Sequence, residues 1–324
     1  MMKKATMVWL IVAASLVLAG LLTVTCALTV AQWDFTNLSS TKLETNTHEI
    51  PEAYQNISVV TDTADVVFIP CEGEKTSVVC HESVKETHRV EVRDGTLIIE
   101  LVDTRKWYDY INIGINFDSP KITVSLPEGA YGTLTHKGST GDVDIPDAFS
   151  FESMDIAVST GDVTCAASVT GAMKIKASTG DIKVGDLSAG ELSLSVSTGK
   201  VSASAVTVEG DMSIRVSTGK SNLTDVTCKN FTSTGNTGGI TMINVVVAEK
   251  MSVTRSTGDV KFDRCDAAEI AIVTDTGDVT GTLRSEKIFL PKSDTGDIDV
   301  PESVSGGKCR ITTDTGDIRI IVVK

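Results

Sequence analysis

The residues whose types and spacing could support chemistry are acids that recur beside glycine near the C-terminus. The candidate cation ligands are Asp275, Asp278, Asp294, Asp297, Asp314 and Asp317. If the copies stack, these carboxylates form a ridge whose mutual repulsion favours cations, and Ca²⁺ accepts oxygen ligands in flexible geometry. The alternative is that each Asp accepts hydrogen bonds from backbone amides near its turn. We favour the alternative and expect weak cation binding only.

The triplet Asp-Thr-Gly also matches the signature of aspartic proteases, but the wider pattern argues against catalysis. Protease chemistry needs two carboxylates that share a proton, whereas Ser replaces the first Asp in earlier copies of this turn. No Walker loop, GxSxG or HExxH motif is present, and the four histidines lack metal-ligand spacing. Paired carboxylates on a β-helix can cleave carbohydrate, yet no acidic pair departs from the repeat. We expect no enzyme and no cofactor, with a carbohydrate-active β-helix as the third-ranked alternative.

The chain has seven cysteines, and one pair among them is a disulfide candidate. Cys71 and Cys80 lie nine residues apart in an expected hairpin, and they could form a bridge in an oxidising compartment. Four others fall at different phases of the repeat described below: Cys165, Cys228, Cys265 and Cys309. We interpret these four mainly as small apolar side chains of the core and leave their pairing open. The absence of CxxC argues against a zinc site.

One aromatic cluster lies outside the apolar N-terminal segment, at Trp107, Tyr108 and Tyr110. Aromatic side chains of this kind suit contacts with a sugar or a protein partner. Packing within a hairpin explains the same residues, and the sequence leaves both interpretations open.

A Thr-Gly pair recurs through the C-terminal part of the chain at intervals of 19 or 20 residues. Its glycines are Gly141, Gly161, Gly180, Gly199, Gly219, Gly238, Gly258, Gly277, Gly296 and Gly316. Glycine supplies the positive φ that a tight turn requires. A fixed period of about 20 residues indicates a stacked architecture.

Apolar side chains alternate on both sides of each Thr-Gly turn. Examples are Val163 two residues after a glycine, and Met173 and Ile175 seven and five residues before the next one. This alternation is typical of strands with one buried face, and one rung cannot bury that face alone. The sequence therefore predicts an all-β fold: a parallel β-solenoid of about ten rungs over residues 139–324. An antiparallel sandwich or barrel is the alternative, although its repeats need not keep so constant a length.

Two local irregularities carry further predictions. The fifth copy holds Thr234-Gly235 and Thr237-Gly238, and Ser233 replaces a buried aliphatic residue, so we expect a bulge or kink there. The last rung ends in a strand at residues 318–324 with no helix or polar segment behind it. Uncovered strand edges pair with other chains, which predicts end-to-end self-association.

The segment before the repeats has three further parts. Residues 7–31 carry no charge and are long enough to cross a membrane, and Lys3 and Lys4 precede them. The positive-inside rule then predicts a cytoplasmic tail at 1–6, a single-pass transmembrane anchor at 7–31 and an extracellular part from residue 32 to 324. A cleaved signal peptide is the alternative. We expect a polar stalk at 32–55 and an irregular β-rich cap at 56–138, in which Asp62–Asp65 resembles a decayed copy of the turn.

The formal net charge of −14 narrows the choice of partner. Nucleic acid is excluded, because phosphate binding needs a basic face. The partners that remain are the membrane, contacted through the N-terminal helix, and a glycan or an envelope protein.

The strand pattern and the serial turns together resemble a known family. The run Ile57, Asp65-Val66, Asp94-Gly95 and Val124-Ser125, followed by repeated Ser-Thr-Gly-Asp turns, resembles the bacterial putative-adhesin family, the LiaG-like β-strand-repeat proteins of cell envelopes. The resemblance covers residues 50–324 and implies an envelope location and a β-solenoid, with no catalytic residues. The sequence departs from the family pattern where Lys200, Lys220 and Gly239 replace the Asp that follows the turn glycine.

Two classes of function agree with these observations. The first, which we favour, is a non-enzymatic, membrane-anchored cell-surface protein that binds a glycan or partner along its polar faces. The second is an accessory protein in cell-envelope stress signalling that acts through the anchor or the cap.

Overall fold

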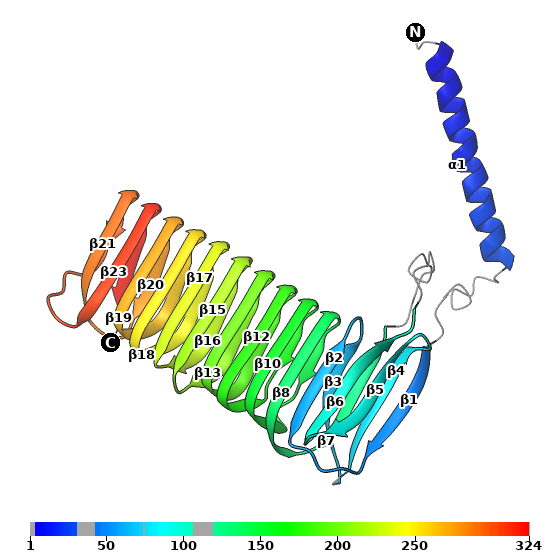
Figure 1. Ribbon diagram of the computed structural model, residues 1–324. Coiled ribbons are helices and arrows are strands. Elements are labelled where there is room, and N and C mark those ends of the chain that lie inside the picture. The colour runs from blue at the N-terminus through cyan, green and yellow to red at the C-terminus, as the bar shows by residue number, and fades with distance from the viewer. Residues whose placement is uncertain (1–3, 31–42, 74, 106–118, 324) are drawn as a thin grey trace.

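The protein consists of one N-terminal helix and a long rod of stacked strands (Figure 1). This computed structural model describes residues 4–30, 43–73, 75–105 and 119–323. The helix α1 (Lys4–Val30) contains the apolar span Trp9–Cys26, with a mean hydropathy of 2.2. By length and composition this helix is suited to cross a membrane, as predicted for residues 7–31, and it fits a membrane anchor or a signal sequence.

The strands form two long parallel ladders that run the length of the rod. In spatial order, the first ladder contains β6 (Thr96–Asp103), β2 (Asn56–Thr61), β8 (Gly129–Thr140), β10 (Phe149–Thr160), β12 (Ser168–Thr179), β13 (Ile182–Thr198), β15 (Asp211–Thr218), β17 (Asn230–Thr237), β18 (Ile240–Thr257), β19 (Val260–Thr276), β23 (Gly307–Thr315) and β21 (Lys287–Thr295). The second contains β7 (Lys121–Pro127), β3 (Asp65–Cys71), β9 (Val143–Ile145), β11 (Val163–Cys165), the first parts of β13, β18 and β19, β14 (Val201–Val208), β16 (Ser221–Cys228), β20 (Val279–Leu283), β24 (Ile318–Val322) and β22 (Ile298–Asp299). The predicted parallel β-solenoid is confirmed.

Equivalent residues of neighbouring rungs face each other, so the register is one whole repeat. Met154 pairs with Met173, and Leu192 pairs with Met212. The positions predicted to face inward are buried: Val163 and Ile182 are fully inaccessible to solvent. Each rung therefore covers the apolar side of its neighbours and shares its backbone hydrogen bonds with them.

The glycine corners lie directly over one another, and this close approach leaves no room for a larger residue. Gly161 has a φ of 145°, and a Cβ atom at this position would overlap the carbonyl oxygen of Gly141 in the preceding rung. A second corner uses residues with left-handed φ, such as Asp186 at 55° and Asn244 at 56°. Asn and Asp tolerate this conformation better than most residues, so each central rung closes into a three-sided coil.

The cap continues the two ladders and adds antiparallel strands. β4 (Thr76–Ser83) pairs antiparallel with β7 and with β1 (Leu43–Ile50), and β5 (Glu86–Arg93) pairs antiparallel with β6. The predicted stalk at 32–55 is thus wrong for residues 43–50, which form a strand; residues 32–42 lie outside the described residues. The predicted boundary at residue 138 also cuts β8, which is already a strand of the first regular rung.

The interpretation of Asp62–Asp65 as a decayed turn is confirmed. A Cβ at Gly141 would overlap the carbonyl oxygen of Ala64, so these two corners stack like the later ones. The side chain of Asp65 accepts a hydrogen bond from the backbone amide of Asp142 at 2.9 Å.

The last two rungs are stacked in the reverse of their chain order. β23 lies between β19 and β21, and β24 lies between β20 and β22 (Figure 1). The chain therefore makes the outermost rung first and then returns to fill the place beneath it. Ile298 in the outermost rung is 44% exposed, whereas Ile318 in the inserted rung is fully buried.

This order changes which strands form the open end of the rod, and the predicted end-to-end association stays a prediction. The C-terminal strand β24 pairs with β20 along its length, but with β22 only at Ile318 and Arg319, so residues 320–322 remain at the edge. The rest of the open edge is β21 with the two-residue strand β22, and it carries Pro291 and Lys292. Proline, lysine and a very short strand are features that discourage edge-to-edge pairing.

The predicted bulge in the fifth copy is wrong. β17 keeps an unshifted register with β15, from Phe231 opposite Met212 to Thr237 opposite Thr218. The small residues Ser233 and Gly235 instead make room for a large side chain from the next rung. Arg255 is 2% exposed; it donates hydrogen bonds to the Thr254 carbonyl and to the Ser233 hydroxyl, both at 2.8 Å.

Candidate binding sites on the rod and its cap

The acids that follow the turn glycines form a hydrogen-bonded ladder along one corner of the rod. Oδ1 of Asp142 accepts the backbone amide of Asp162 at 2.8 Å, and Oδ1 of Asp162 accepts the amide of Asp181 at 2.7 Å. The glycine and the residue two positions after it donate to the rung on the other side. The backbone amide of the acid, which lies between these two residues, therefore has no carbonyl acceptor, and the Asp carboxylate of the preceding rung accepts its hydrogen bond instead.

The six acids of the predicted cation ridge belong to this arrangement or lie beside it. Asp278 accepts the amide of Asp317, and Asp317 accepts the amide of Asp297, both at 2.9 Å. Asp294 forms an ion pair with Lys292 at 2.9 Å, and Asp275 and Asp314 are exposed. The favoured alternative, hydrogen bonding to backbone amides, describes Asp278 and Asp317, although the amides belong to the neighbouring rung; Asp297 lies in the outermost rung and donates its own amide to Asp317. Weak cation binding stays a prediction.

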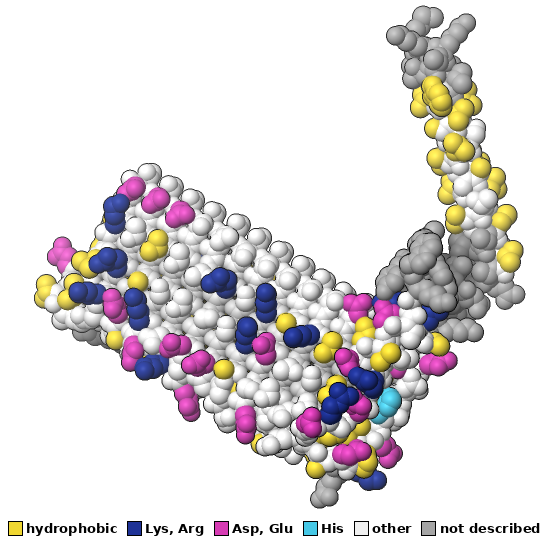
Figure 2. All heavy atoms as spheres, viewed as in Figure 1, with side chains coloured by type: hydrophobic (Ala, Val, Ile, Leu, Met, Phe, Trp, Pro, Cys, Tyr) yellow, Lys and Arg dark blue, Asp and Glu magenta, His cyan; other side chains and the backbone are white. Residues whose placement is uncertain are grey.

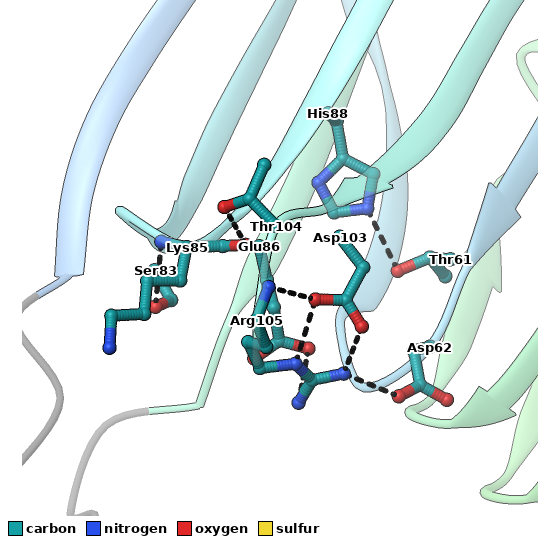
Figure 3. Close-up of polar contacts among 9 residues, drawn as sticks. All are labelled: Thr61, Asp62, Ser83, Lys85, Glu86, His88, Asp103, Thr104 and Arg105. Atoms are coloured by element: carbon teal, nitrogen blue, oxygen red, sulfur yellow. Dashed lines mark hydrogen bonds and ion pairs between the residues drawn. The ribbon is translucent and has the colours of Figure 1, made fainter. Parts of the chain in front are cut away.

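The cap contains a buried polar network that the sequence did not indicate. Oε2 of Glu82 lies 2.6 Å from Nδ1 of His88. Nε2 of His88 lies 3.1 Å from the Thr61 hydroxyl (Figure 3). The amide of Asn46 donates to Oε1 of Glu82 at 2.8 Å. These side chains come from β1, β2, β4 and β5, so the network joins four strands of the cap.

The order carboxylate, imidazole and hydroxyl is the order used by nucleophilic hydrolases. In this cap, however, Thr61 is 6% exposed and Glu82 is 2% exposed. The small cavity beside them is enclosed by Ser83, His88 and Pro120 among others, and it has room for about one water molecule. A substrate carbonyl cannot reach the hydroxyl, so the network is suited to hold strands together.

Cys80, Glu82 and His88 form the one group of three potential metal ligands within 4.8 Å of one another among the described residues. Both ring nitrogens of His88 and both carboxylate oxygens of Glu82 already have protein partners. Burial raises the pKa of the Cys80 thiol to about 12, and the nearby charge of Glu82 adds to this effect. The hydrogen-bonding atoms of Glu82 and His88 are therefore paired with protein groups without a metal ion.

Outside this network, Arg105 gathers three acids at the surface of the cap (Figure 3). Its guanidinium lies 2.8 Å from Glu86, 2.8 Å from Asp103 and 3.7 Å from Asp62. Partial burial raises the pKa of Glu86, and the positive charge of Arg105 opposes that change. The cluster joins the ends of β2 and β6 to the start of β5.

The predicted Cys71–Cys80 disulfide is wrong, and both thiols are free. Cys71 lies opposite Pro127 of β7, whereas Cys80 lies opposite Ile122 of the same strand. Five residues along a strand correspond to about 17 Å, far beyond the reach of a disulfide.

The four cysteines of the repeats are core side chains, as predicted. Cys165, Cys228, Cys265 and Cys309 are free and at most 6% exposed. Burial raises the pKa of each thiol, to about 11 for Cys265 and to about 12 for the other three.

The predicted contact aromatics Trp107, Tyr108 and Tyr110 lie outside the described residues. A different aromatic group lies where the cap meets the rod, and the sequence analysis missed it. Tyr131 stacks on Tyr54 with ring centroids 6.2 Å apart and also meets Phe149 and Phe151. These residues are far apart in the sequence, and no motif connects them.

The outer faces of the rod are polar and regular. Figure 2 shows basic and acidic side chains interspersed over one long face, between broad areas of other polar side chains and backbone. Hydroxyl groups of neighbouring rungs line up, with the hydroxyls of Ser193 and Ser213 3.3 Å apart. The depressions beside Gly235 and beside Gly239 are open to solvent. Surfaces of this kind are suited to contact an extended partner.

The fold and these surfaces define a repeat β-solenoid protein with an N-terminal apolar helix. The sequence matches the Toastrack DUF4097 family over residues 54–219 and 204–324, and the chain belongs to this family. The predicted resemblance to a putative-adhesin family is thereby confirmed at the level of the family; the likeness to LiaG itself stays a prediction.

Solved structures with a similar fold have low sequence identity to this chain. A putative adhesin from Bacteroides fragilis is 16% identical, with 75% of this chain and 97% of that chain covered and a TM-score of 0.45. A putative adhesin from Parabacteroides merdae is 13% identical, with 76% and 97% covered and a TM-score of 0.48. A putative lipid binding protein from Parabacteroides distasonis is 16% identical, with 87% and 97% covered and a TM-score of 0.30. No curated protein matches the sequence.

Proposed function

We propose that this protein is a non-enzymatic, membrane-anchored protein of the cell surface that binds an extended partner along its rod. The N-terminal helix is the anchor, and Lys3 and Lys4 place the N-terminus in the cytoplasm by the positive-inside rule. The rod, from residue 43 to the C-terminus, then lies outside the cell. A glycan or an envelope protein is the partner.

One observation carries this proposal: the rod presents polar outward side chains at the same position of successive rungs, one rung spacing apart. Along the face of the first ladder, alternate positions point outward and are exposed or half-buried: Asp155, Lys174, Lys176, Ser193, Ser195, Ser213 and Arg215. A repeating partner can contact many equivalent rungs, and weak contacts then add through multivalency. A catalytic site would instead need a cleft that encloses its substrate.

The proposal is tested by shortening the rod without changing its corners. Deletion of residues 181–219 joins Gly180 to Lys220 and removes two whole rungs, because both ends lie at the same corner position. Solenoids of this kind fold as nearest-neighbour stacks, so we expect the shortened chain to remain folded. Binding of the full chain and of the shortened chain, each in lipid nanodiscs, is measured against a glycan array and envelope extracts.

We expect the shortened chain to bind more weakly while its circular dichroism spectrum remains that of a β-protein. A matched control is Arg105→Ala, which removes the charged centre of the cap cluster and leaves the rod intact. If the shortened chain binds as well as the full chain, and the cap variant loses binding, the rod is not the binding surface. That result would favour the alternative role in envelope signalling through the cap or the anchor.

A further inference from the structure

The hydrogen-bonded Asp ladder is interrupted in the middle of the rod. It runs without a break from Asp65 to the amide of Lys200, which donates to Asp181 at 2.7 Å, and it resumes where Asp278 donates to Asp259 at 3.2 Å. Between these points, Lys200, Lys220 and Gly239 occupy the position of the accepting Asp. Three successive rungs therefore have no carboxylate to offer the next corner.

The interruption leaves three backbone amides without an acceptor. Among the residues that the structure describes, the N–H groups of Lys220, Gly239 and Asp259 form no hydrogen bond, although their neighbours Gly219, Gly238 and Ile240 all donate to the next rung. Corner amides of adjacent rungs are about 4.8 Å apart, so the three unpaired donors form a row about 10 Å long. Oriented backbone amides contribute positive partial charge, which favours an anion beside them.

The side chains around the row favour negative charge on a ligand. Lys200 and Lys220 are exposed and form no ion pair within the described part of the chain. An open depression, lined by Lys220, Gly239, Asp259 and Lys261 among others, lies where the missing carboxylate of residue 239 would be. Glycine at this position has no side chain to enter the depression, and a Cβ there would lie 2.8 Å from the carbonyl oxygen and 3.5 Å from the amide nitrogen of Asp259.

The nearby carboxylate of Asp259 does not close the site. It accepts the amide of Asp278 in the following rung, on the side away from Gly239, and it forms an ion pair with Lys261 at 3.0 Å. Its charge is therefore balanced by a partner of its own, and its oxygens serve the next corner.

We propose that the interrupted corner at Lys200, Lys220 and Gly239 binds an oxyanion, a carboxylate or phosphate group, carried by an acidic surface polymer. One ligand oxygen takes the place that Asp Oδ1 holds at the other corners, beside Gly239, and accepts the free amide of Asp259; a second group of the polymer, one rung away, accepts the free amide of Gly239. The lysine ammonium groups pair with the remaining charge. The choice of a surface polymer as the ligand rests on the proposed function, whereas the anion site itself rests on the geometry of the corner.

The test titrates the full chain in zwitterionic nanodiscs with four probes: sodium acetate, inorganic phosphate, oligogalacturonate and polyglycerol phosphate. Amide chemical shifts locate the site, and calorimetry measures the affinity. The variant Lys200→Asp/Lys220→Asp restores the ladder at two of its three gaps, for the amides of residues 220 and 239, with the residue that fills this position in other rungs, and it removes both lysine charges. The control Lys250→Asp/Lys308→Asp makes the same change of charge at exposed positions of β18 and β23, away from the interrupted corner.

We expect the amides of Lys220, Gly239 and Asp259 to shift with acetate or phosphate. The restored ladder should weaken binding by about tenfold or more, as the loss of a charged hydrogen bond implies, while the control pair keeps most of the affinity. Preference for oligogalacturonate identifies carboxylate as the ligand group, and preference for polyglycerol phosphate identifies phosphate.

Two results would contradict the anion site. One is that none of these three amides shifts with any probe. The other is an equal loss of affinity in both lysine variants, which would indicate a general effect of charge. Binding of polymers that the restored ladder leaves unchanged also overturns the site but preserves the proposed function. Binding of acetate or phosphate without binding of either polymer preserves the anion site and contradicts the polymer as its ligand.

Discussion

Arg255 is a buried cation in an apolar core, and its replacement makes an unusual prediction. The side chain is 2% exposed, and its two hydrogen bonds go to neutral oxygens of Thr254 and Ser233. No carboxylate among the described residues pairs with it. Replacement of both polar partners by apolar side chains, in the variant Ser233→Val/Arg255→Met, should therefore stabilise the rod.

The magnitude follows from the cost of keeping the charge in the core. Burial lowers the pKa of Arg255 to about 10, and at about 1.4 kcal/mol for each pKa unit the charged form costs about 3 kcal/mol in the folded state. The two hydrogen bonds offset part of this cost, and their removal together with Ser233 leaves no unpaired hydroxyl. Replacement of buried charged groups and their partners by apolar side chains of similar volume is often neutral or stabilising by about 1 to 4 kcal/mol. Val at residue 233 also matches Ile214 and Val253, which lie on either side of it.

Urea denaturation of the wild type, the double variant and the single variant Arg255→Met measures the effect. We expect the double variant to gain about 1 to 3 kcal/mol, and the single variant to gain less, because Ser233 then stays buried without a partner. The stabilisation should shrink above pH 10, where the wild-type Arg255 begins to lose its proton and its penalty falls. A double variant less stable than the wild type by more than about 1 kcal/mol would refute this reasoning.

Two further predictions concern the corner and the first regular rung. Gly219→Ala combines a φ of 140° with overlap between the new Cβ and the carbonyl oxygen of Gly199, so thermal melting should show a loss of at least about 3 kcal/mol; an unchanged melting temperature would contradict the stacked corners. His136 is buried between Val59 and Ile156, and burial lowers its pKa from 6.5 to about 4. The unfolded chain takes up this proton first, so stability should fall by about 3 kcal/mol as the pH drops from 6.5 to 4, and His136→Leu should remove that part of the pH dependence; an identical pH profile in the variant would show that another group titrates.

The period of the repeat was predictable because each of its causes is local. Glycine at the corner, alternation of apolar residues and a constant spacing all act within about one rung. Val163 and Ile182 could therefore be assigned to the core from the sequence, and both are buried. The same local pattern indicated that Asp62–Asp65 is an older copy of the turn.

Contacts between distant residues were not predictable in the same way. Spacing alone suggested a bridge between Cys71 and Cys80, but pairing with β7 separates them along that strand. Glu82 and His88 gave no sequence signal, because their network also needs Thr61 and Asn46 from two other strands. The irregular fifth copy suggested a kink, and only the next rung revealed that Ser233 and Gly235 accommodate Arg255.

The sequence by itself determined the rung, the buried columns and the corner on which the rungs stack. The tertiary structure alone decided which rungs are neighbours at the C-terminus and in which direction each Asp reaches. The physical reason is that rungs of similar sequence offer similar edges to one another. The path of the chain between β22 and β23 selects the neighbour, and that path places the last rung inside the outermost one.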